Sequence, residues 1–529
     1  MLKGPIPTHF NRIGKNRSTV FFLFLTVLLG VYVRLANVLP ALAPINDGGL
    51  FYTMTVDLQA NHYLIPATTS YNASGIPFAY PPLAFYLAGF LSNISGLSLF
   101  EIFRILPAVI SMAAVPGLYL LAKDLLKSDA QASIASLLFA LTPGTFFWVV
   151  MGGGITRGLG LAFALMTLHC AYLLYDKKEI RYAFAVAFYA TGVVLSHPEM
   201  AIHTIASAFA MFLFWGRTRR GVGLSILAAG LTILLTSPWW FSVLTNHGLT
   251  PILAAAGTGR YSADAIQSFL LFDFTQEVSL TIVGCLALIG MFFSLTQKNY
   301  FFVSWFIFIY VSEPRSAPLY LMPLIAMLAA LSLHQIIFPG LQPTKPRPIE
   351  NTNWADVLLA SGVAKLAFAF LLGYLLFMAI NVSWYQGYSM TLKKDDFEAI
   401  DWVKTNTPKD SSFIIITSEQ PMTDSLTEWF PALTGRVSLA TAQGFEWMPA
   451  GKFFEKIDEY NDVQLCIYQD ESCLFDWAQK TKQPFEYIIV RPKADFPMIP
   501  ILETALSRSS TTQKVFHRPG ISIFAVHKP

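Results

Sequence analysis

Eleven apolar segments, each close to the length of a membrane-crossing helix, fill most of the first 380 residues of this 529-residue chain. A helix needs roughly 20 apolar residues to cross the ~30 Å hydrocarbon core of a bilayer. Only 13% of the residues are charged, which is about half the share in soluble proteins. The sequence therefore predicts a multi-pass α-helical membrane protein and argues against a nucleic-acid binder or a cytosolic enzyme. The segments are Thr19–Leu39, Ile102–Ala122, Ala130–Val150, Gly158–Tyr175, Tyr182–Ser196, Met200–Trp215, Val222–Phe241, Val278–Leu295, Tyr300–Ser312, Leu319–Phe338 and Val357–Ile380.

The basic residues predict how the segments are oriented. Cytoplasmic loops of membrane proteins are enriched in Lys and Arg, and here the basic clusters before and between segments all fall on one side if the N-terminus is cytoplasmic. A further apolar run, Tyr80–Leu91, is short and would invert every later loop if it crossed the membrane. We therefore expect an interfacial helix there, within a long first outer loop (40–101). The N-terminal tail (1–18) and a linker (339–356) are then cytoplasmic, in a plasma (inner) membrane protein whose transmembrane domain covers 19–380.

The C-terminal part of the chain, residues 389–529, has the pattern of a small α/β domain. An amphipathic run at Asp395–Asn406 is followed by β-rich runs at Phe413–Thr417, Tyr487–Val490 and Ile521–Val526. Eleven spans place this domain outside the cytoplasm. Cys466 and Cys473 lie in it with six residues between them, so we expect a disulfide if the outer compartment is oxidising. Two reduced, buried thiols are the alternative.

Polar residues suited to chemistry gather in the predicted outer loops. Two predicted segments, Tyr182–Ser196 and Tyr300–Ser312, are too short to cross the membrane fully. The outer turns that follow them, at 196–199 and 312–315, should therefore lie below the outer surface. Irregular backbone at that depth is tolerated only inside protein or beside a water-filled cavity. Asp47 follows the first span in the run Asn46-Asp47-Gly48-Gly49, but Asp is also common in turns that have no catalytic role. His197 could equally be the cap of a helix. The outer candidates are Asp47, Asp57, His62, Glu101, Arg104, Arg157, His197, Glu199, Arg260, Asp264, Glu313 and Arg315.

Several well-known catalytic motifs are missing from the sequence. It has no Gly-Lys-Ser/Thr phosphate loop, no His-Glu-x-x-His pair, no paired Cys-x-x-Cys spacing and no Gly-x-Ser-x-Gly elbow. These patterns mark nucleotide-binding, zinc-dependent and serine-hydrolase sites. The run Met151-Gly152-Gly153-Gly154 is predicted to be an outer turn.

The pattern resembles the GT-C superfamily of integral-membrane glycosyltransferases, and is similar to the protein O-mannosyltransferases and the lipid A aminoarabinose transferases. The resemblance rests on Asp47 after the first span, the long first outer loop, Tyr80-Pro81-Pro82-Leu83 with Arg104-Ile105-Leu106-Pro107, and a soluble domain after the last span. It implies inverting transfer of a sugar from a polyprenyl-phosphate donor to an extracytoplasmic acceptor (lipid, glycan or protein). The acceptor and the donor sugar stay open.

The resemblance also implies roles for single residues. Asp47 matches the general base, and arginines would bind the donor phosphate. Many relatives carry a second acidic residue beside the first-loop Asp, where this chain has Gly48, so no cofactor is assigned and a divalent metal ion is left open. The phosphate-binding candidates are Arg104, Arg157, Arg260 and Arg315; the cavity candidates are Asp57, Tyr80, Pro81, Pro82, His197, Glu199 and Glu313.

Two other functions are compatible with the sequence. A transporter or flippase for a lipid-linked or anionic substrate also needs outer charges and broken helices, but it predicts matching polar groups at the midplane and on the inner side, and the chain has few. A non-catalytic assembly subunit that only presents its outer domain is the third hypothesis. Sugar transfer that depends on Asp47 separates the three.

Overall fold

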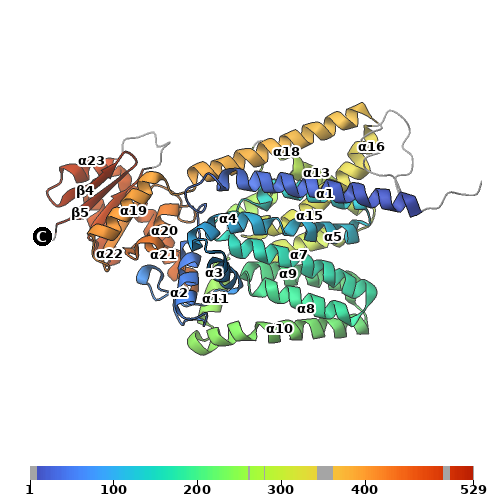
Figure 1. The fold of residues 1–529 in the computed structure, drawn as a ribbon, viewed down its shortest axis with the longest axis horizontal. Coiled ribbons are helices and arrows are strands. Elements are labelled where there is room, and N and C mark those ends of the chain that lie inside the picture. The colour runs from blue at the N-terminus through green and yellow to red at the C-terminus, as the bar shows by residue number, and fades with distance from the viewer. Residues whose placement is uncertain (1–8, 260–262, 279, 342–360, 493–500, 528–529) are drawn as a thin grey trace, which may run out of the picture.

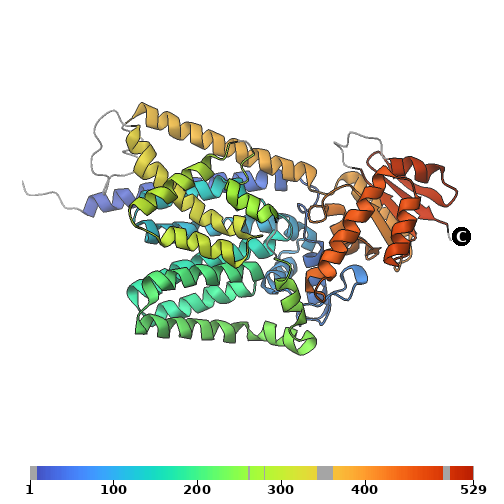
Figure 2. The same cartoon turned by 180° about the vertical axis from the view of Figure 1, so that it is seen from behind.

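The computed structural model describes residues 9–259, 263–278, 280–341, 361–492 and 501–527. It consists of a helical bundle and a smaller α/β domain at its C-terminal end (Figure 1), which we call the outer domain after the location that the sequence predicts for it. The start of α1 (His9–Val38) and the outer domain lie at opposite ends of the bundle in both views (Figure 1, Figure 2). The chain is a mostly helical, multi-pass membrane protein, as the sequence predicts.

Seven helical segments are long and apolar enough to cross a membrane. Four other predicted spans coincide with shorter apolar helices, α6 (Asp129–Leu141), α8 (Ile180–Val194), α13 (Ile282–Thr296) and α14 (Phe301–Ser312). The predicted span Ala130–Val150 is therefore too long, because α6 ends before Pro143, which cannot continue the hydrogen-bond ladder. The seven are Thr19–Ala36, Leu99–Leu126, Gly154–Lys177, Pro198–Gly216, Arg219–His247, Ala317–Gly340 and Gly362–Asn406.

These segments are built from consecutive helices. The bundle contains α4 (Leu99–Ser111), α5 (Ala114–Leu126), α7 (Gly154–Lys177), α9 (Pro198–Met211), α10 (Arg219–His247), α15 (Ala317–Ser332), α16 (Phe338–Gly340) and α18 (Gly362–Ser389), with π-helical turns at Phe212–Gly216 and Leu333–Ile337 and a 3-10 turn at Pro143–Thr145. Helices α1 and α18 lie side by side along one edge (Figure 1, Figure 2). Most of the predicted linker 339–356 lies outside the described residues.

Short elements lie between the bundle and the outer domain (Figure 1). They are α2 (Gly49–Ala60), a 3-10 turn at Tyr71–Ala73, α3 (Leu83–Ser95) and α11 (Thr250–Ala256). Helix α12 (Ala263–Leu271) packs against α14 through the rings of Phe269 and Phe306. The helix expected at Tyr80–Leu91 is α3, whose 13 residues reach only about 20 Å. Its first amide, Leu83 N, donates to Leu195 O at 2.9 Å, which fixes α3 against the turn between α8 and α9.

The outer domain is a five-stranded sheet covered by helices. Its strand order is β2-β1-β3-β5-β4, with β1, β2 and β3 parallel and β4 and β5 antiparallel at one side. The strands are β1 (Ser412–Ile416), β2 (Val437–Ser438), β3 (Tyr487–Val490), β4 (Thr512–Arg518) and β5 (Ile521–Val526). The helices are α19 (Lys394–Asn406), α20 (Ser425–Thr434), α21 (Lys452–Gln464), α22 (Ser472–Thr481) and α23 (Ile501–Arg508), with 3-10 turns at Phe445–Trp447 and Leu465–Tyr468.

One apolar core joins the first outer loop to the outer domain. Leu50 and Met54 of α2 and Phe78 share a cluster of buried side chains with Trp429 and Phe430 of α20. Burial of such large side chains contributes about 1.5–3 kcal/mol each. The outer domain is therefore packed onto the loop that carries Asp47.

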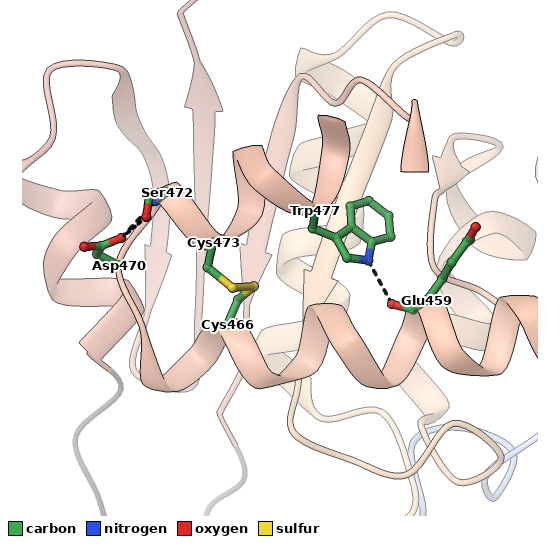
Figure 3. Close-up of a disulfide and its surroundings, with 6 residues drawn as sticks. All are labelled: Glu459, Cys466, Asp470, Ser472, Cys473 and Trp477. Atoms are coloured by element: carbon green, nitrogen blue, oxygen red, sulfur yellow. Dashed lines mark hydrogen bonds between the residues drawn. A yellow bond between two sulfur atoms is a disulfide. The ribbon is translucent and has the colours of Figure 1, made fainter. Parts of the chain in front are cut away.

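Cys466 and Cys473 form a disulfide, with their Cα atoms 5.6 Å apart. It joins the 3-10 turn after α21 to the first residues of α22 (Figure 3). Nearby, Trp477 Nε1 donates to Glu459 O at 2.9 Å and fastens α22 to α21 a second time. This pairing is the one that the sequence predicts for an oxidising compartment.

Candidate active site

Asp47 lies in a tight loop between α1 and α2. The residues on either side of it have positive φ angles, 51° at Asn46 and 127° at Gly48, a backbone that glycine adopts easily and Asn tolerates. Asp47 Oδ2 is 3.0 Å from Arg157 Nη1, and Asp47 Oδ1 accepts from Gly153 N at 2.9 Å. The Asp47 side chain is 16% exposed, so the carboxylate is held between an arginine and a main-chain amide yet stays open to solvent.

The glycine run 152–154 is what lets α7 approach this loop. A Cβ atom on Gly152 would lie 2.2 Å from Asp47 O, and one on Gly153 would lie 2.7 Å from Asp47 Oδ2. Real Cβ atoms do not come so close to other heavy atoms, so neither position accepts a side chain without movement. The turn predicted from this run therefore packs directly against the Asp47 loop.

Arg157 is fixed by contacts on both sides. Besides its ion pair with Asp47, its Nη1 atom donates to Trp148 O at 3.1 Å, and its side chain is 22% exposed. Next to it, Thr156 Oγ1 lies 3.2 Å from the hydroxyl of Tyr80. These contacts bring Tyr80, one of the predicted cavity residues, against the Asp47–Arg157 pair.

A second group of charges comes from the turns after α8 and α14. Arg315 Nη2 is 2.5 Å from Glu199 Oε1, and Arg315 Nε is 3.9 Å from Glu313 Oε1. Although burial opposes ionisation of Glu313, hydrogen bonds from His203 and Ser316 lower its pKa below the ordinary value. Arg315 therefore faces two carboxylates, and its side chain is 44% exposed.

Tyr80 and His197 join the two groups of charges. Their ring centroids are 6.1 Å apart, edge to face, and His197 Nδ1 lies 3.5 Å from the hydroxyl of Tyr320. His197 is also the N-cap of α9, where it accepts from Met200 N. The structure thus gives His197 the capping contact proposed as its alternative role and also places it within the cluster. Pro81 and Pro82 follow Tyr80 and are buried.

Two of the predicted residues that the structure describes, Arg104 and Asp57, are not part of this cluster. Arg104 is paired with Glu101, and it donates to Leu39 O at 2.7 Å and to Ala41 O at 2.8 Å, so it caps the end of α1. Asp57 accepts from Thr69 Oγ1 and Ser70 Oγ, both at 2.6 Å, and fastens the first outer loop. Arg260 lies outside the described residues.

The outer domain adds acidic residues that sequence reasoning did not select. Glu428 on α20 is 4% exposed, and its Oε1 accepts from Gly48 N at 2.8 Å. Burial, reinforced by the charge of Asp47, raises the pKa of Glu428 to about 8. Glu446 lines a pocket between α11 and residues 445–454, and burial raises its pKa as well. No sequence pattern around Glu428 or Glu446 indicates a role, because each residue comes near the site only when the chain folds.

The described residues around Asp47 offer few ligands for a metal ion. Among the residues that the structure describes, no group of three or more His, Cys, Asp or Glu side chains could hold a metal ion. The second carboxyl near Asp47 is that of Glu428, and its Oε1 is engaged by the Gly48 amide. The described residues thus do not form a ready metal site.

Comparisons with known proteins agree with this architecture. A family model for dolichyl-phosphate-mannose-protein mannosyltransferases matches residues 79–241, and no curated protein sequence matches the chain. The fold is similar to the arabinofuranosyltransferase AftD from mycobacteria (TM-score 0.56, 16% identity, over 97% of this chain and 40% of AftD). It is also similar to ArnT from Cupriavidus metallidurans bound to undecaprenyl phosphate (TM-score 0.54, 14% identity, over 95% of this chain and 97% of ArnT).

The two structures differ in how much of their length the chain accounts for. It spans about two fifths of AftD and nearly all of ArnT. The family model covers the segment from the first outer loop to α10, which contains Tyr80, Arg157 and His197. The chain thus resembles the dolichyl-phosphate-mannose-protein mannosyltransferase family over residues 79–241, and it shares its fold with AftD and ArnT over nearly its whole length.

Proposed function

We propose that this protein is an inverting glycosyltransferase that moves a sugar from a polyprenyl-phosphate carrier to an acceptor outside the cytoplasm. The observation that carries the proposal is the Asp47 carboxylate, held by Arg157 at 3.0 Å and by the Gly153 amide at 2.9 Å. Both contacts fix the orientation of the carboxylate oxygens. An oriented and partly exposed carboxylate is what a general base requires.

The chemistry follows from this arrangement. The acceptor oxygen forms a bond to the anomeric carbon of the sugar while the bond from that carbon to the phosphate oxygen breaks. The acceptor proton passes to Asp47, and the electron pair of the broken bond leaves with the lipid phosphate. Positioned proton transfer of this kind contributes about 10²–10⁴-fold in rate.

The leaving phosphate needs positive charge that is already in place. Arg315, exposed at 44%, has donors that a phosphate oxygen can reach, and Arg157 lies beside the base. We assign the donor phosphate to these two arginines, since Arg104 is engaged by carbonyl groups at the end of α1. ArnT, which has a similar fold, was determined with undecaprenyl phosphate, and this supports a polyprenyl-phosphate donor here.

The remaining cluster residues suit recognition of the sugar. Tyr80, His197 and Glu199 present hydroxyl, imidazole and carboxylate groups that can bond to sugar hydroxyls, and Glu313 holds the turn that carries Arg315 through its bonds to Ser316. A donor with a lipid tail must enter from the bilayer, so we further propose a plasma membrane location with the outer domain outside the cytoplasm. Cysteine labels at Lys178 and at Lys452 should therefore react from opposite sides, and labelling from one side would overturn this topology.

The decisive experiment is the substitution Asp47→Asn in purified, membrane-inserted protein. Asn keeps the size and polarity of Asp but cannot take the proton, so we expect turnover at least ~100-fold slower with donor binding retained. Asp401→Asn, the same change at a side chain that is 78% exposed, is the matched control. Near-normal sugar transfer by Asp47→Asn would remove the base from the mechanism.

A further inference from the structure

Residues on both sides of Asp47 are bonded to two consecutive residues of the outer domain. On one side, Glu428 Oε1 accepts from Gly48 N at 2.8 Å; on the other, Trp429 Nε1 donates to Asn46 O at 2.9 Å. Glu428 and Trp429 are 4% and 0% exposed. A methyl group on Gly49 would lie 2.4 Å from Glu428 O, so α20 is in direct contact with the backbone of the Asp47 loop.

Helix α20 is itself fixed to the interior of the outer domain. Its N-cap, Asp424, accepts from Leu426 N at 3.1 Å and is 1% exposed. The same carboxylate accepts from Thr417 Oγ1, just after β1, and from the Tyr460 hydroxyl of α21 at 2.7 Å. A continuous set of hydrogen bonds therefore runs from the sheet, through Asp424 and α20, to the loop of Asp47.

The Asp47 loop depends on such support. Asn46 and Gly48 both have positive φ angles, and a non-glycine residue in this region carries a conformational cost that its surroundings must offset. The bundle supplies one support, in which Gly152 N donates to Ile45 O at 2.9 Å. The bonds to Glu428 and Trp429 come from the outer domain and hold the two peptide units that flank Asp47.

We propose that Glu428 is a positioning residue of the outer domain that holds the Asp47 loop and limits transfer at alkaline pH. This rests on the proposed function, because it assigns a regulator to the same base. The charged and titratable groups that face the Glu428 carboxyl are Asp47, Arg157 on α7, Tyr71 in the first outer loop and Glu446 in the outer domain. Three of these four are acidic or become negative on losing a proton, so the site favours an uncharged Glu428.

The alkaline limit follows from the charge that Glu428 acquires. Below pH about 8 the carboxyl keeps its proton, and its carbonyl oxygen can accept from the Gly48 amide without adding charge. Above that pH, a second negative charge faces Asp47. An added negative charge in the site lowers its affinity for an anionic phosphate, and we expect an effect of roughly 5-fold.

The test compares Glu428→Gln with Glu428→Ala in the full-length protein, using undecaprenyl phosphate as the probe of binding. The Gln amide can accept from Gly48 N and has no charge at any pH. We expect the dissociation constant of the wild type to rise roughly 5-fold between pH 6.5 and 9, and that of Glu428→Gln to stay constant. An equal rise in both proteins would overturn the proposed alkaline limit.

Hydrogen exchange of the segment 45–50 tests the positioning role without any assay of transfer. We expect Glu428→Ala to exchange the Gly48 amide at least about 10-fold faster than the wild type, and Glu428→Gln to protect it. If Glu428→Ala does not fold, Trp429→Phe keeps the ring and removes the bond to Asn46 O, and it should speed exchange of the same segment. Unchanged exchange in the variants that fold would overturn the positioning role. Altered exchange in a protein that transfers no sugar would overturn the proposed function alone.

Discussion

Gly153→Ala should displace the proposed base without altering any charged group. Gly153 has φ −68° and ψ −14°, angles that alanine adopts without strain. The added methyl group would lie 2.7 Å from Asp47 Oδ2, 2.9 Å from Cγ and 3.0 Å from Oδ1, whereas ordinary contacts begin near 3.4 Å. The carboxylate must therefore retreat by roughly 0.7 Å, which would stretch its bonds to Gly153 N and Arg157.

The size of the effect follows from that displacement. A misplacement of about 1 Å at a reacting group can cost on the order of 100-fold in rate, so we expect kcat to fall about 10- to 100-fold. The affinity for undecaprenyl phosphate should change little, because Arg315 is untouched. The assay is single-turnover sugar transfer, with binding measured separately.

A matched control separates the clash from a general effect of alanine. Gly230→Ala, in α10, places its methyl group where no heavy atom lies within 4 Å, so it should transfer sugar at the wild-type rate. Thermal unfolding of both variants shows whether the fold is retained. A folded Gly153→Ala protein with wild-type kcat would refute the role given to the Asp47 geometry.

Three other predictions follow from the contacts. Arg315→Ala should weaken undecaprenyl phosphate binding by about 10-fold or more. Arg104→Ala should leave binding unchanged and lower the free energy of unfolding by about 2 kcal/mol, because it leaves carbonyl groups at the end of α1 unpaired. The reverse pattern would exchange the roles of the two arginines. Cys466→Ser should lower the stability of the outer domain by roughly 2–3 kcal/mol, measured by thermal unfolding with and without reductant, and equal stability in both states would contradict the link. Because the pKa of Glu428 is raised to about 8 in the fold, its contribution to the free energy of unfolding is complete below pH about 4.5 and is lost as the pH rises to about 8. This contribution is on the order of 5 kcal/mol. Glu428→Gln should flatten this part of the curve of stability against pH, and parallel curves for the two proteins would show that other groups cause the slope.

The sequence predicts the helical membrane-spanning fold, because hydropathy is a local property. Several of the residues that it selects, Asp47, Arg157 and the turns at His197 and Arg315, lie close together in the structure, and ionisable groups beside short spans are conspicuous in a sequence. Hydropathy does not register the break at Pro143, however, and so it joins α6 to the irregular segment that precedes α7.

Two features of the site depend on contacts that no local pattern encodes. In the sequence, Arg104 is a charged residue in a predicted outer loop. In the structure, carbonyl groups at the end of α1 fix the position of its side chain. Glu428 reads as an ordinary residue of an amphipathic helix, and only the packing of α20 on α2 buries it beside Asp47. Gly48 and Glu428 are 380 residues apart in the sequence, so no short motif can reveal their contact.

The bond from Glu428 to Gly48 also sets an order of events during biosynthesis. Asp47 emerges from the ribosome early, while α20 is made 380 residues later, after the last membrane helix. Until the outer domain has folded, the Asp47 loop lacks Glu428 and Trp429, which are the partners of Gly48 N and Asn46 O. On the proposed mechanism we therefore expect a chain truncated after α18 to carry Arg157 and Arg315 and still to transfer no sugar, because it lacks these two contacts.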